Sequence, residues 1–190
     1  MISREKVLQL LEKHIKTANT IKHMLATEAI MKALAQKLKP EKTDIWAMVG
    51  LTHDLDYEEI KDDKEHAGKS VAILKQENAD LPEEAYQAIK AHNADKNPDY
   101  DPPQSLMDWS LSICDSLTGL IVATALVRPE KNLASVKVKS IMKKFKQPSF
   151  AAGTRREDIK LCEEKLNIPL PEFVELSLKA MQAIASDLGL

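Results

Sequence analysis

The sequence is poor in several residue types, and each shortage excludes a class of protein. Glycine occurs only 5 times in 190 residues, against an average usage of about 7%. A β-sandwich, a barrel or a glycine-looped dinucleotide fold is therefore disfavoured. Two cysteines, Cys114 and Cys162, cannot form a disulfide framework, which favours a reduced, intracellular setting.

Long hydrophobic runs are also missing from the sequence. Residues 1–16 are charged and amphipathic and do not contain the uninterrupted apolar stretch of a signal peptide. The longest apolar run, Leu111 to Val127, contains Asp115 and two threonines and is short and polar for a membrane span. We therefore expect a cytoplasmic protein that does not enter a membrane.

Helix-forming residues dominate the composition of the sequence. Ala, Leu, Glu, Lys, Arg, Gln and Met account for more than half of the chain, and 44% of the residues are hydrophobic. The length suits one compact domain, and no linker or internal repeat divides it. We predict an all-α protein with helices over residues 3–15, 20–39, 43–54, 64–77, 80–92, 104–127, 132–146, 154–166 and from 171 onward.

Two helix starts are assigned from capping residues. Asp80 with Glu83, and Thr154 with Glu157, have the spacing of a capping box. Pro40 ends the second predicted helix.

Charge is unevenly distributed along the chain. The whole sequence carries −2, but residues 128–160 contain ten basic and three acidic residues, which leaves −9 for the remainder. A local basic excess on an acidic protein indicates either an anion-binding surface or an ordinary solvated helix face.

Four of the five histidines fall at positions that predict a shared site. His23 lies on the apolar face of its helix, and the doublet His53-Asp54 ends the third helix. His66 opens the fourth predicted helix and His92 ends the fifth. Taken singly, an inward histidine is more often a hydrogen-bonded core residue, and one at a helix end can serve the helix dipole. His14 matches no such pattern and is assigned as structural or exposed.

Asp115 is the most informative acidic residue. It lies in the most apolar helix, and no Lys or Arg falls within two turns of it on that helix. Burying a carboxylate costs several kcal/mol unless a cation or several donors meet it. A distant basic residue, a pair of helix N-termini or a metal remain as its partners. Imidazole and carboxylate ligands together suit Fe, Mn, Co, Ni or Zn.

In order along the chain, His23, His53-Asp54 and Asp115 resemble the HD superfamily of metal-dependent phosphohydrolases. That family places a His, a His-Asp doublet and a later Asp on different helices of an all-α bundle. The resemblance covers about residues 20–127 and implies an orthogonal helical bundle, with residues 128–190 as a basic helical extension of one domain over 1–190. With His66 and His92 included, the pattern of this chain is similar to the six-ligand subset of the family, which includes HD-GYP phosphodiesterases and HD-type hydrolases of diadenosine polyphosphates. The Gly-Tyr-Pro motif of the HD-GYP proteins is absent from this sequence.

The text Leu-Thr-His-Asp-Leu-Asp-Tyr-Glu and the later Asp-Ser-Leu-Thr-Gly at 115–119 also resemble a group of stand-alone bacterial HD hydrolases. Many relatives have Ile-Gly after the doublet, where this chain has Leu55-Asp56.

The resemblance implies a role for each ligand candidate. His23, His53, Asp54 and Asp115 would hold a first divalent ion, and Asp54 would bridge to a second ion that His66 and His92 also hold. Bound ions lower the pKa of water to about 7 and neutralise charge on a phosphoryl group. Asp54 thus takes a catalytic role, and Asp56 or Glu58, just after the doublet, is a candidate base, with exposed loop acids as the alternative reading. Arg128, Lys139, Lys144 and Arg155 would supply a basic rim for an anionic substrate.

Three functions follow from these residues. The leading hypothesis is a metal-dependent phosphohydrolase that cleaves a phosphate ester or anhydride of a nucleotide or related small metabolite. The alternative is a metal-containing nucleotide sensor without turnover. A nucleic-acid partner is disfavoured because the chain is acidic overall and its basic stretch offers only Phe145 and Phe150 for stacking. The sequence leaves open whether the ions number one or two and whether the chain forms a homo-oligomer.

Overall fold

The computed structural model describes residues 2–190, and within them every regular element is a helix. The prediction of an all-α fold is thus confirmed. In chain order the elements are α1 (Arg4–His14), α2 (Ala18–Leu38), η1 (Pro40–Lys42), α3 (Thr43–Thr52), η2 (Asp63–Glu65), α4 (Gly68–Gln76), α5 (Glu83–Ala91), α6 (Leu106–Leu126), α7 (Val138–Phe145), α8 (Arg156–Lys165), α9 (Leu170–Ala183) and α10 (Ala185–Leu188).

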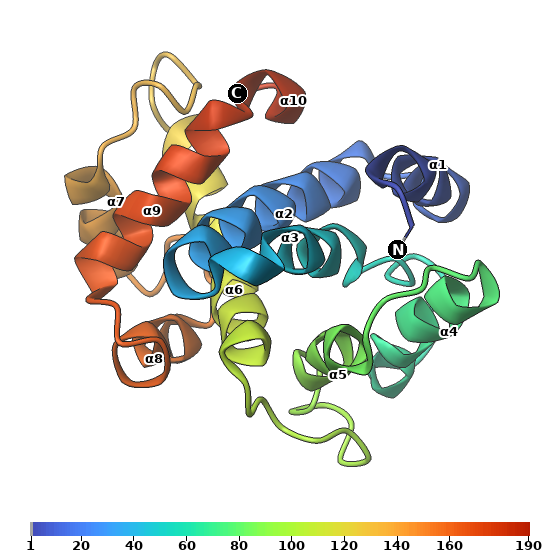
Figure 1. The fold of residues 1–190 in the computed structure, drawn as a ribbon. Helices are drawn as coiled ribbons and strands as arrows, with labels where there is room; N and C mark the ends of the chain where they lie inside the picture. Colours follow the sequence, from blue (N-terminus) through green and yellow to red (C-terminus); the bar gives the residue numbers. More distant parts are fainter. Residues whose placement is uncertain (1) are drawn as a thin grey trace.

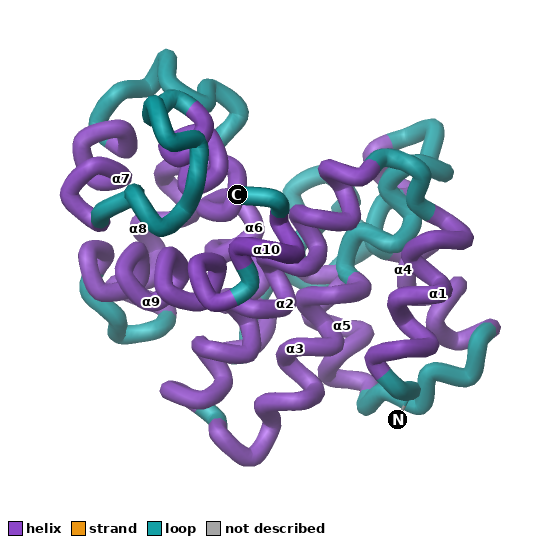
Figure 2. Tube along the Cα trace, turned by 90° about the horizontal axis from the view of Figure 1, so that it is seen from above, coloured by secondary structure: helices purple, strands orange, loops and turns teal. Residues whose placement is uncertain are grey.

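Helices α2 and α3 lie side by side at the centre of the molecule (Figure 1). Helix α6 packs against α2, α3 and α5, and it also contacts α7, α8 and α9. Helices α7 to α9 lie on one side of the central pair and α1, α4 and α5 on the other (Figure 1). The loops that join the helices run over the outside of the bundle (Figure 2).

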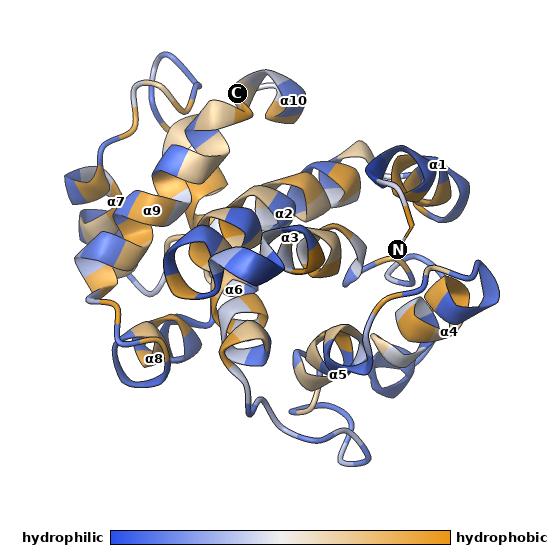
Figure 3. Cartoon of the chain, viewed as in Figure 1, coloured by the Kyte–Doolittle hydropathy of each residue, from blue (hydrophilic) through white to orange (hydrophobic). Residues whose placement is uncertain are grey.

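The helices bury their apolar faces in one continuous core that runs from Ile2 to Leu188 (Figure 3). Trp46 of α3 and Phe173 of α9 are among its largest fully buried side chains. Because α9 contributes to this core, the basic C-terminal region packs onto the same apolar centre as α2 and α6.

Helix α6 is the one element of residues 2–190 that is long and apolar enough to cross a membrane by length and composition. It exceeds the apolar run read from the sequence, and 56% of its most apolar window is buried inside the protein. A core helix passes the same test, and the packing of α6 against six other helices is that of a core helix.

Both predicted capping boxes are wrong. Helix α5 begins after Pro82 and α8 after Arg155, and neither has a side-chain cap. Asp80 has φ +52°, so the chain turns there and does not enter a helix. Ser105 and Asp108 form the capping box in this protein, at the start of α6.

Candidate metal centre

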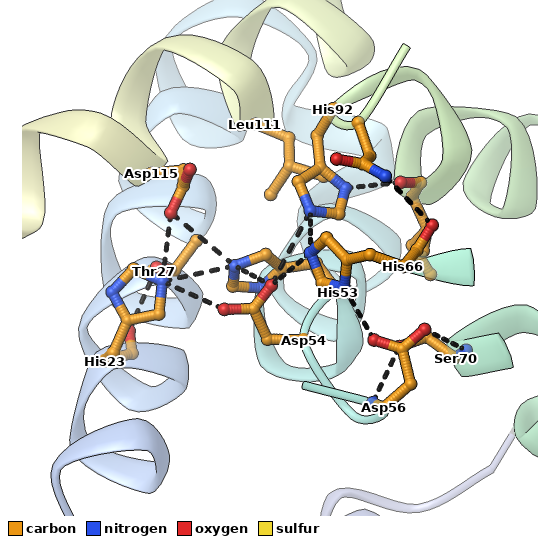
Figure 4. A network of polar contacts seen from close by, with 12 residues as sticks. His23, Thr27, His53, Asp54, Asp56, His66, Ser70, His92, Leu111 and Asp115 are labelled. Atoms are coloured by element: carbon orange, nitrogen blue, oxygen red, sulfur yellow. Dashed lines mark hydrogen bonds and ion pairs between the residues drawn. The ribbon is translucent and has the colours of Figure 1, made fainter. Parts of the chain in front are cut away.

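The six ligand candidates meet at one point between four helices (Figure 4). His23 comes from α2 and Asp115 from α6, while His53 and Asp54 follow directly on α3. His66 follows η2, and His92 is the C-cap of α5. A cavity of about 450 Å³ opens at this point, with walls of Asn19, Thr20, His23, Asp54, Tyr57, His66, His92, Asn93, Asp115 and Arg155.

Asp54 stands at the middle of the cluster and faces all four imidazoles. Its Oδ1 lies 3.3 Å from His53 Nε2, 3.2 Å from His66 Nε2 and 3.6 Å from His92 Nε2. Its Oδ2 lies 3.5 Å from His23 Nε2. Two sets of ligand atoms, each within 4.8 Å of one another, share this carboxylate: His23, His53 and Asp54, and Asp54, His66 and His92.

Each histidine is held by an acceptor at Nδ1, so that Nε2 points inward. His53 Nδ1 donates to the carbonyl of Gly50 at 2.9 Å, and His92 Nδ1 donates to that of Ile89. His66 Nδ1 donates to Asp56 Oδ1 at 2.7 Å. An acceptor at Nδ1 fixes the tautomer and leaves the Nε2 lone pair for a ligand.

His23 is fixed in the same way through a hydroxyl group. Its Nδ1 lies 3.0 Å from Thr118 Oγ1, and that hydroxyl donates its own proton to the carbonyl of Asp115 at 2.7 Å. The lone pairs of Thr118 are therefore free to accept from His23. All four imidazoles thus present Nε2 to the same centre.

The Nε2 atoms approach one another closely. His23 and His53 are 3.2 Å apart at Nε2, and His66 and His92 are 3.0 Å apart. Two lone pairs at this separation repel unless a proton or a metal cation lies between them. Four imidazole nitrogens around shared carboxylates are the donor set that divalent transition ions prefer, so the residues present fit a metal centre.

Protons compete with metal ions for these nitrogens. Burial opposes the charged ring of His23, but the hydrogen bond and charge of Asp115, together with Asp54, raise its pKa to about 9. Burial opposes the charge on His66 as well, and Asp54 and Asp56 raise its pKa to about 10. The surrounding imidazoles overcome the effect of burial and hold the pKa of Asp54 and Asp115 well below the usual range of a carboxyl.

Asp115 has two kinds of partner. Its Oδ1 lies 3.0 Å from His23 Nε2, and its Oδ2 lies 3.4 Å from Arg155 Nη2. Arg155 also lies 3.6 Å from Asp95 and 3.1 Å from Asp158, so its charge is shared among three carboxylates. Of the partners left open by the sequence, a distant basic residue is therefore present, and it binds the oxygen that faces away from His23.

The two candidate bases have different surroundings, and neither lines the cavity. Asp56 is fully buried; its Oδ1 accepts from His66 and its Oδ2 accepts from the backbone N–H of Ser70 at 2.9 Å. Glu58 accepts from the backbone N–H groups of Lys16 and Thr17, each at 2.8 Å, and does not line the cavity. Asp56 therefore orients a ligand, and Glu58 binds the segment before α2.

Only one residue of the expected basic rim reaches the cavity. Arg155 lines it, whereas Arg128, Lys139 and Lys144 do not. Arg128 donates to Ser135 Oγ at 2.8 Å, and Lys144 Nζ lies 4.4 Å from the centre of the Phe150 ring. Helix α7 packs its apolar residues against α6 and α9, which leaves its lysines away from the cluster.

Four wall residues were not selected from the sequence: Asn19, Thr20, Tyr57 and Asn93. The position of Asn93 and Tyr57 next to the histidines and the doublet was the only available signal. Asn93 donates through Nδ2 to the carbonyls of Asp63 and His66, at 2.7 and 3.2 Å, and so ties the end of α5 to the segment that carries His66.

The comparisons with known proteins agree with this geometry. A family model described as HD domain matches residues 20–120, more than half of the chain and the part that contains all six ligand candidates. No curated protein matches the chain, and no solved structure does. The family match and the clustered histidines and aspartates together identify the chain as a member of the HD domain family, an all-α family of metal-binding hydrolases.

Proposed function

We propose that the protein is a metal-dependent phosphohydrolase that cleaves a phosphate ester or anhydride of a nucleotide or a related small metabolite. One observation carries the proposal: four imidazole Nε2 atoms converge on a shared carboxylate in the wall of an open cavity that also contains an arginine. The family match supports the hydrolase class, and the arginine supports an anionic substrate.

We further propose two ion positions. His23, His53, Asp54 and Asp115 would hold one ion, and Asp54, His66 and His92 would hold a second, with Fe, Mn, Co, Ni and Zn as candidates. When bound, such ions polarise a phosphoryl oxygen and lower the pKa of water. Asp56 serves as a positioning residue, because its carboxylate fixes the ring of His66.

Arg155 is the residue of this chain that would bind the phosphate of the substrate. Its guanidinium lies in the cavity wall beside Asp115 and is 38% exposed, so an anion entering the cavity can reach it. A guanidinium binds phosphate through paired N–H donors and stabilises charge that develops on phosphoryl oxygens. Since three carboxylates share it in the absence of substrate, a phosphate would replace part of those contacts.

Hydrolysis of a nucleotide panel by protein loaded with Mn or Fe tests the proposal. Asp54→Ala should abolish cleavage, because it removes the carboxylate shared by both ligand sets. Glu58→Gln is the matched control, since this acid lies four residues away and does not line the cavity. Turnover by the Asp54→Ala variant would refute the assignment.

The absence of Asp56 and Glu58 from the cavity walls favours a second candidate function, a metal-containing nucleotide sensor. Asp54 and Asp115 are the only acids among the described cavity walls, and both belong to the ligand cluster. A sensor predicts that nucleotides raise Tm while no product forms with any of the five ions. Product formation with a single one of them rejects it.

A further inference from the structure

A second cavity adjoins the metal centre. It has a volume of about 610 Å³ and shares two wall residues, His92 and Arg155, with the first. It lies between the 93–103 loop, α6 and α8. Ligand-binding cavities in proteins usually measure about 300–1,000 Å³, so it can accept a small organic group.

The walls of this cavity differ in chemistry from those of the metal centre. Most of its surface comes from apolar or aromatic side chains, including Tyr100, Pro102, Pro103, Trp109, Ile113 and Leu161. Trp109 is the largest of these, and it lies in the first turn of α6, only partly buried. Apolar walls that include an indole favour a ring system as the ligand.

One polar atom in the cavity walls is left without a partner. Ser112 contributes to the cavity, and its Oγ is buried with no hydrogen-bond partner among residues 2–190. A buried hydroxyl without a partner is costly, and such groups in native proteins call for an explanation. Ser112 thus places one unsatisfied hydroxyl just behind the apolar wall of the cavity.

The walls are fixed in place before any ligand binds. Asn97 Nδ2 donates to the carbonyl of Lys64 at 2.8 Å, which ties the 93–103 loop to η2. Tyr100 packs against Gly68 so closely that a Cβ there would lie 2.2 Å from its hydroxyl oxygen. On the other side, Arg156 donates to the carbonyls of Phe145 and Gln147 and so anchors the start of α8. Preorganised walls lower the entropic cost of binding.

We propose that this second cavity binds the organic part of the substrate, an uncharged aromatic group with hydrogen-bonding atoms, of which a nucleobase is the type. The inference rests on the proposed function for its phosphate end. Arg155 lines both cavities, so a phosphate that contacts it faces the ions on one side while the attached ring enters the apolar cavity on the other. The proposed substrates are thereby narrowed to phosphate esters and anhydrides that carry an aromatic ring.

A third cavity provides the comparison. It has a volume of about 360 Å³, shares Asn19 and His23 with the metal centre, and is closed by the C-terminal residues Leu188 to Leu190. No aromatic side chain contributes to its described walls beyond His23, and no unpartnered buried polar atom of residues 2–190 belongs to it. Val122 of α6 lies in its wall, as Ser112 does in that of the second cavity.

Calorimetric titration of the metal-loaded full chain with nucleosides tests the proposal without turnover. The probes are adenosine, guanosine, cytidine and uridine, each with its 5′-monophosphate, and inorganic phosphate. We expect at least one nucleoside to bind and its monophosphate to bind more tightly. Ser112→Phe, which fills the second cavity, should weaken both by about tenfold or more and leave inorganic phosphate unchanged. Val122→Phe, which fills the third cavity, should change neither.

Trp109→Ala gives a second route should Ser112→Phe not fold, since it removes an aromatic wall and adds no bulk. It too should weaken nucleoside binding, with unchanged binding of inorganic phosphate as the check that the metal centre is intact. If Ser112→Phe abolishes nucleoside binding but the unaltered protein hydrolyses no nucleotide, the ligand site is supported and the proposed phosphohydrolase activity is refuted. Hydrolysis of nucleotides with KM unaffected by Ser112→Phe and Trp109→Ala would overturn the inference and leave the function standing. Loss of nucleoside binding in Val122→Phe alone, or no binding of any of the four, would also overturn it.

Discussion

At the scale of single residues, the site depends on what lies behind each ligand. Gly50, Ile89 and Thr118 accept from His53, His92 and His23 through neutral oxygens. His66 alone is held by a carboxylate, that of Asp56. A charged acceptor at Nδ1 raises the basicity of Nε2 and strengthens its bond to a metal. In the proposed two-ion centre, the affinity for the second ion would therefore depend on Asp56 more than the affinity for the first.

Asp56→Asn tests this dependence. The amide keeps the size of the side chain but removes the charge, so we expect the affinity for the second ion to fall by about 10–100-fold while the first is largely retained. Metal content per chain after dialysis, with competition titration of Mn²⁺, measures both. Glu58→Gln makes the same chemical change outside the cavity and should retain both ions. Equal losses at both ions in Asp56→Asn would contradict the positioning role.

The elements that bring the ligands together pack unusually closely at one place. Gly50 of α3 lies against the backbone of α2, and a Cβ there would be 2.8 Å from the carbonyl oxygen of Thr27 and 2.9 Å from the nitrogen of Glu28. His23 lies about one turn before this contact on α2, and His53 lies about one turn after it at the end of α3. The absence of a side chain at Gly50 thus lets the two histidines meet at 3.2 Å.

Gly50→Ala should separate α2 from α3, because backbone atoms cannot move aside as a side chain does. We expect a destabilisation of about 1–3 kcal/mol in denaturant unfolding and weaker binding of the first ion. Gly119→Ala is the matched control: it lies inside α6, and a Cβ there meets nothing within 4 Å. That substitution should stabilise the helix by about 0.5–1 kcal/mol. Equal behaviour of the two variants would show that the close contact has no role.

How far the sequence predicts these elements depends on where the chain is periodic. Helices α2 and α6 are long and apolar on one face, and they begin and end within two residues of their predicted bounds. The sequence predicts the fourth helix from residue 64, but α4 begins at Gly68, because Ala67 adopts φ +70° and breaks the helix just after His66. It predicts the basic helix over 132–146, but α7 covers only Val138–Phe145.

The same limit applies to the site. All of its ligand candidates except His66 are at the ends or on the faces of periodic helices, where the residue type and its spacing point inward. The roles of Asp56 and Glu58 depend on the irregular turns of residues 53–67, which carry no periodic signal. Arg155 could not be separated from the other basic residues, because its place beside Asp115 depends on how α8 packs against α6.

At the scale of the whole molecule, the metal centre joins segments that are distant in sequence. Its ligands come from α2, the end of α3, the turn after η2, the end of α5 and α6. Bound ions would therefore cross-link four helices of the bundle. An ion that binds the folded state alone stabilises it by about 2.7 kcal/mol at a concentration 100 times its Kd.

Removal of metal should therefore lower the stability of the entire fold. With about 2–4 °C per kcal/mol for a chain of this size, treatment with a chelator should lower Tm by roughly 5–10 °C, and re-addition of Mn²⁺ should restore it. Asp54→Ala should show a much smaller chelator effect, because it lacks the shared ligand. An unaltered protein that contains metal yet melts at the same temperature with and without chelator would show that the ions do not bridge the helices.

The metal-free protein should respond to pH in the opposite sense from metal binding. In it, the pKa of His23 is raised to about 9 and that of His66 to about 10, from ordinary values near 6.5. Between pH 6.5 and these values the folded state binds more protons than the unfolded state, so the contribution of both rings is complete below pH 6.5 and is lost as pH rises toward 10. Over the same interval the imidazoles lose the protons that compete with ions, so metal affinity increases.

Scanning calorimetry from pH 6.5 to 9.5 tests both effects. The Tm of the chelated protein should fall as pH rises, and the increase in Tm on adding Mn²⁺ should become larger. A gain that shrinks with pH would mean that the ions bind elsewhere than at these nitrogens.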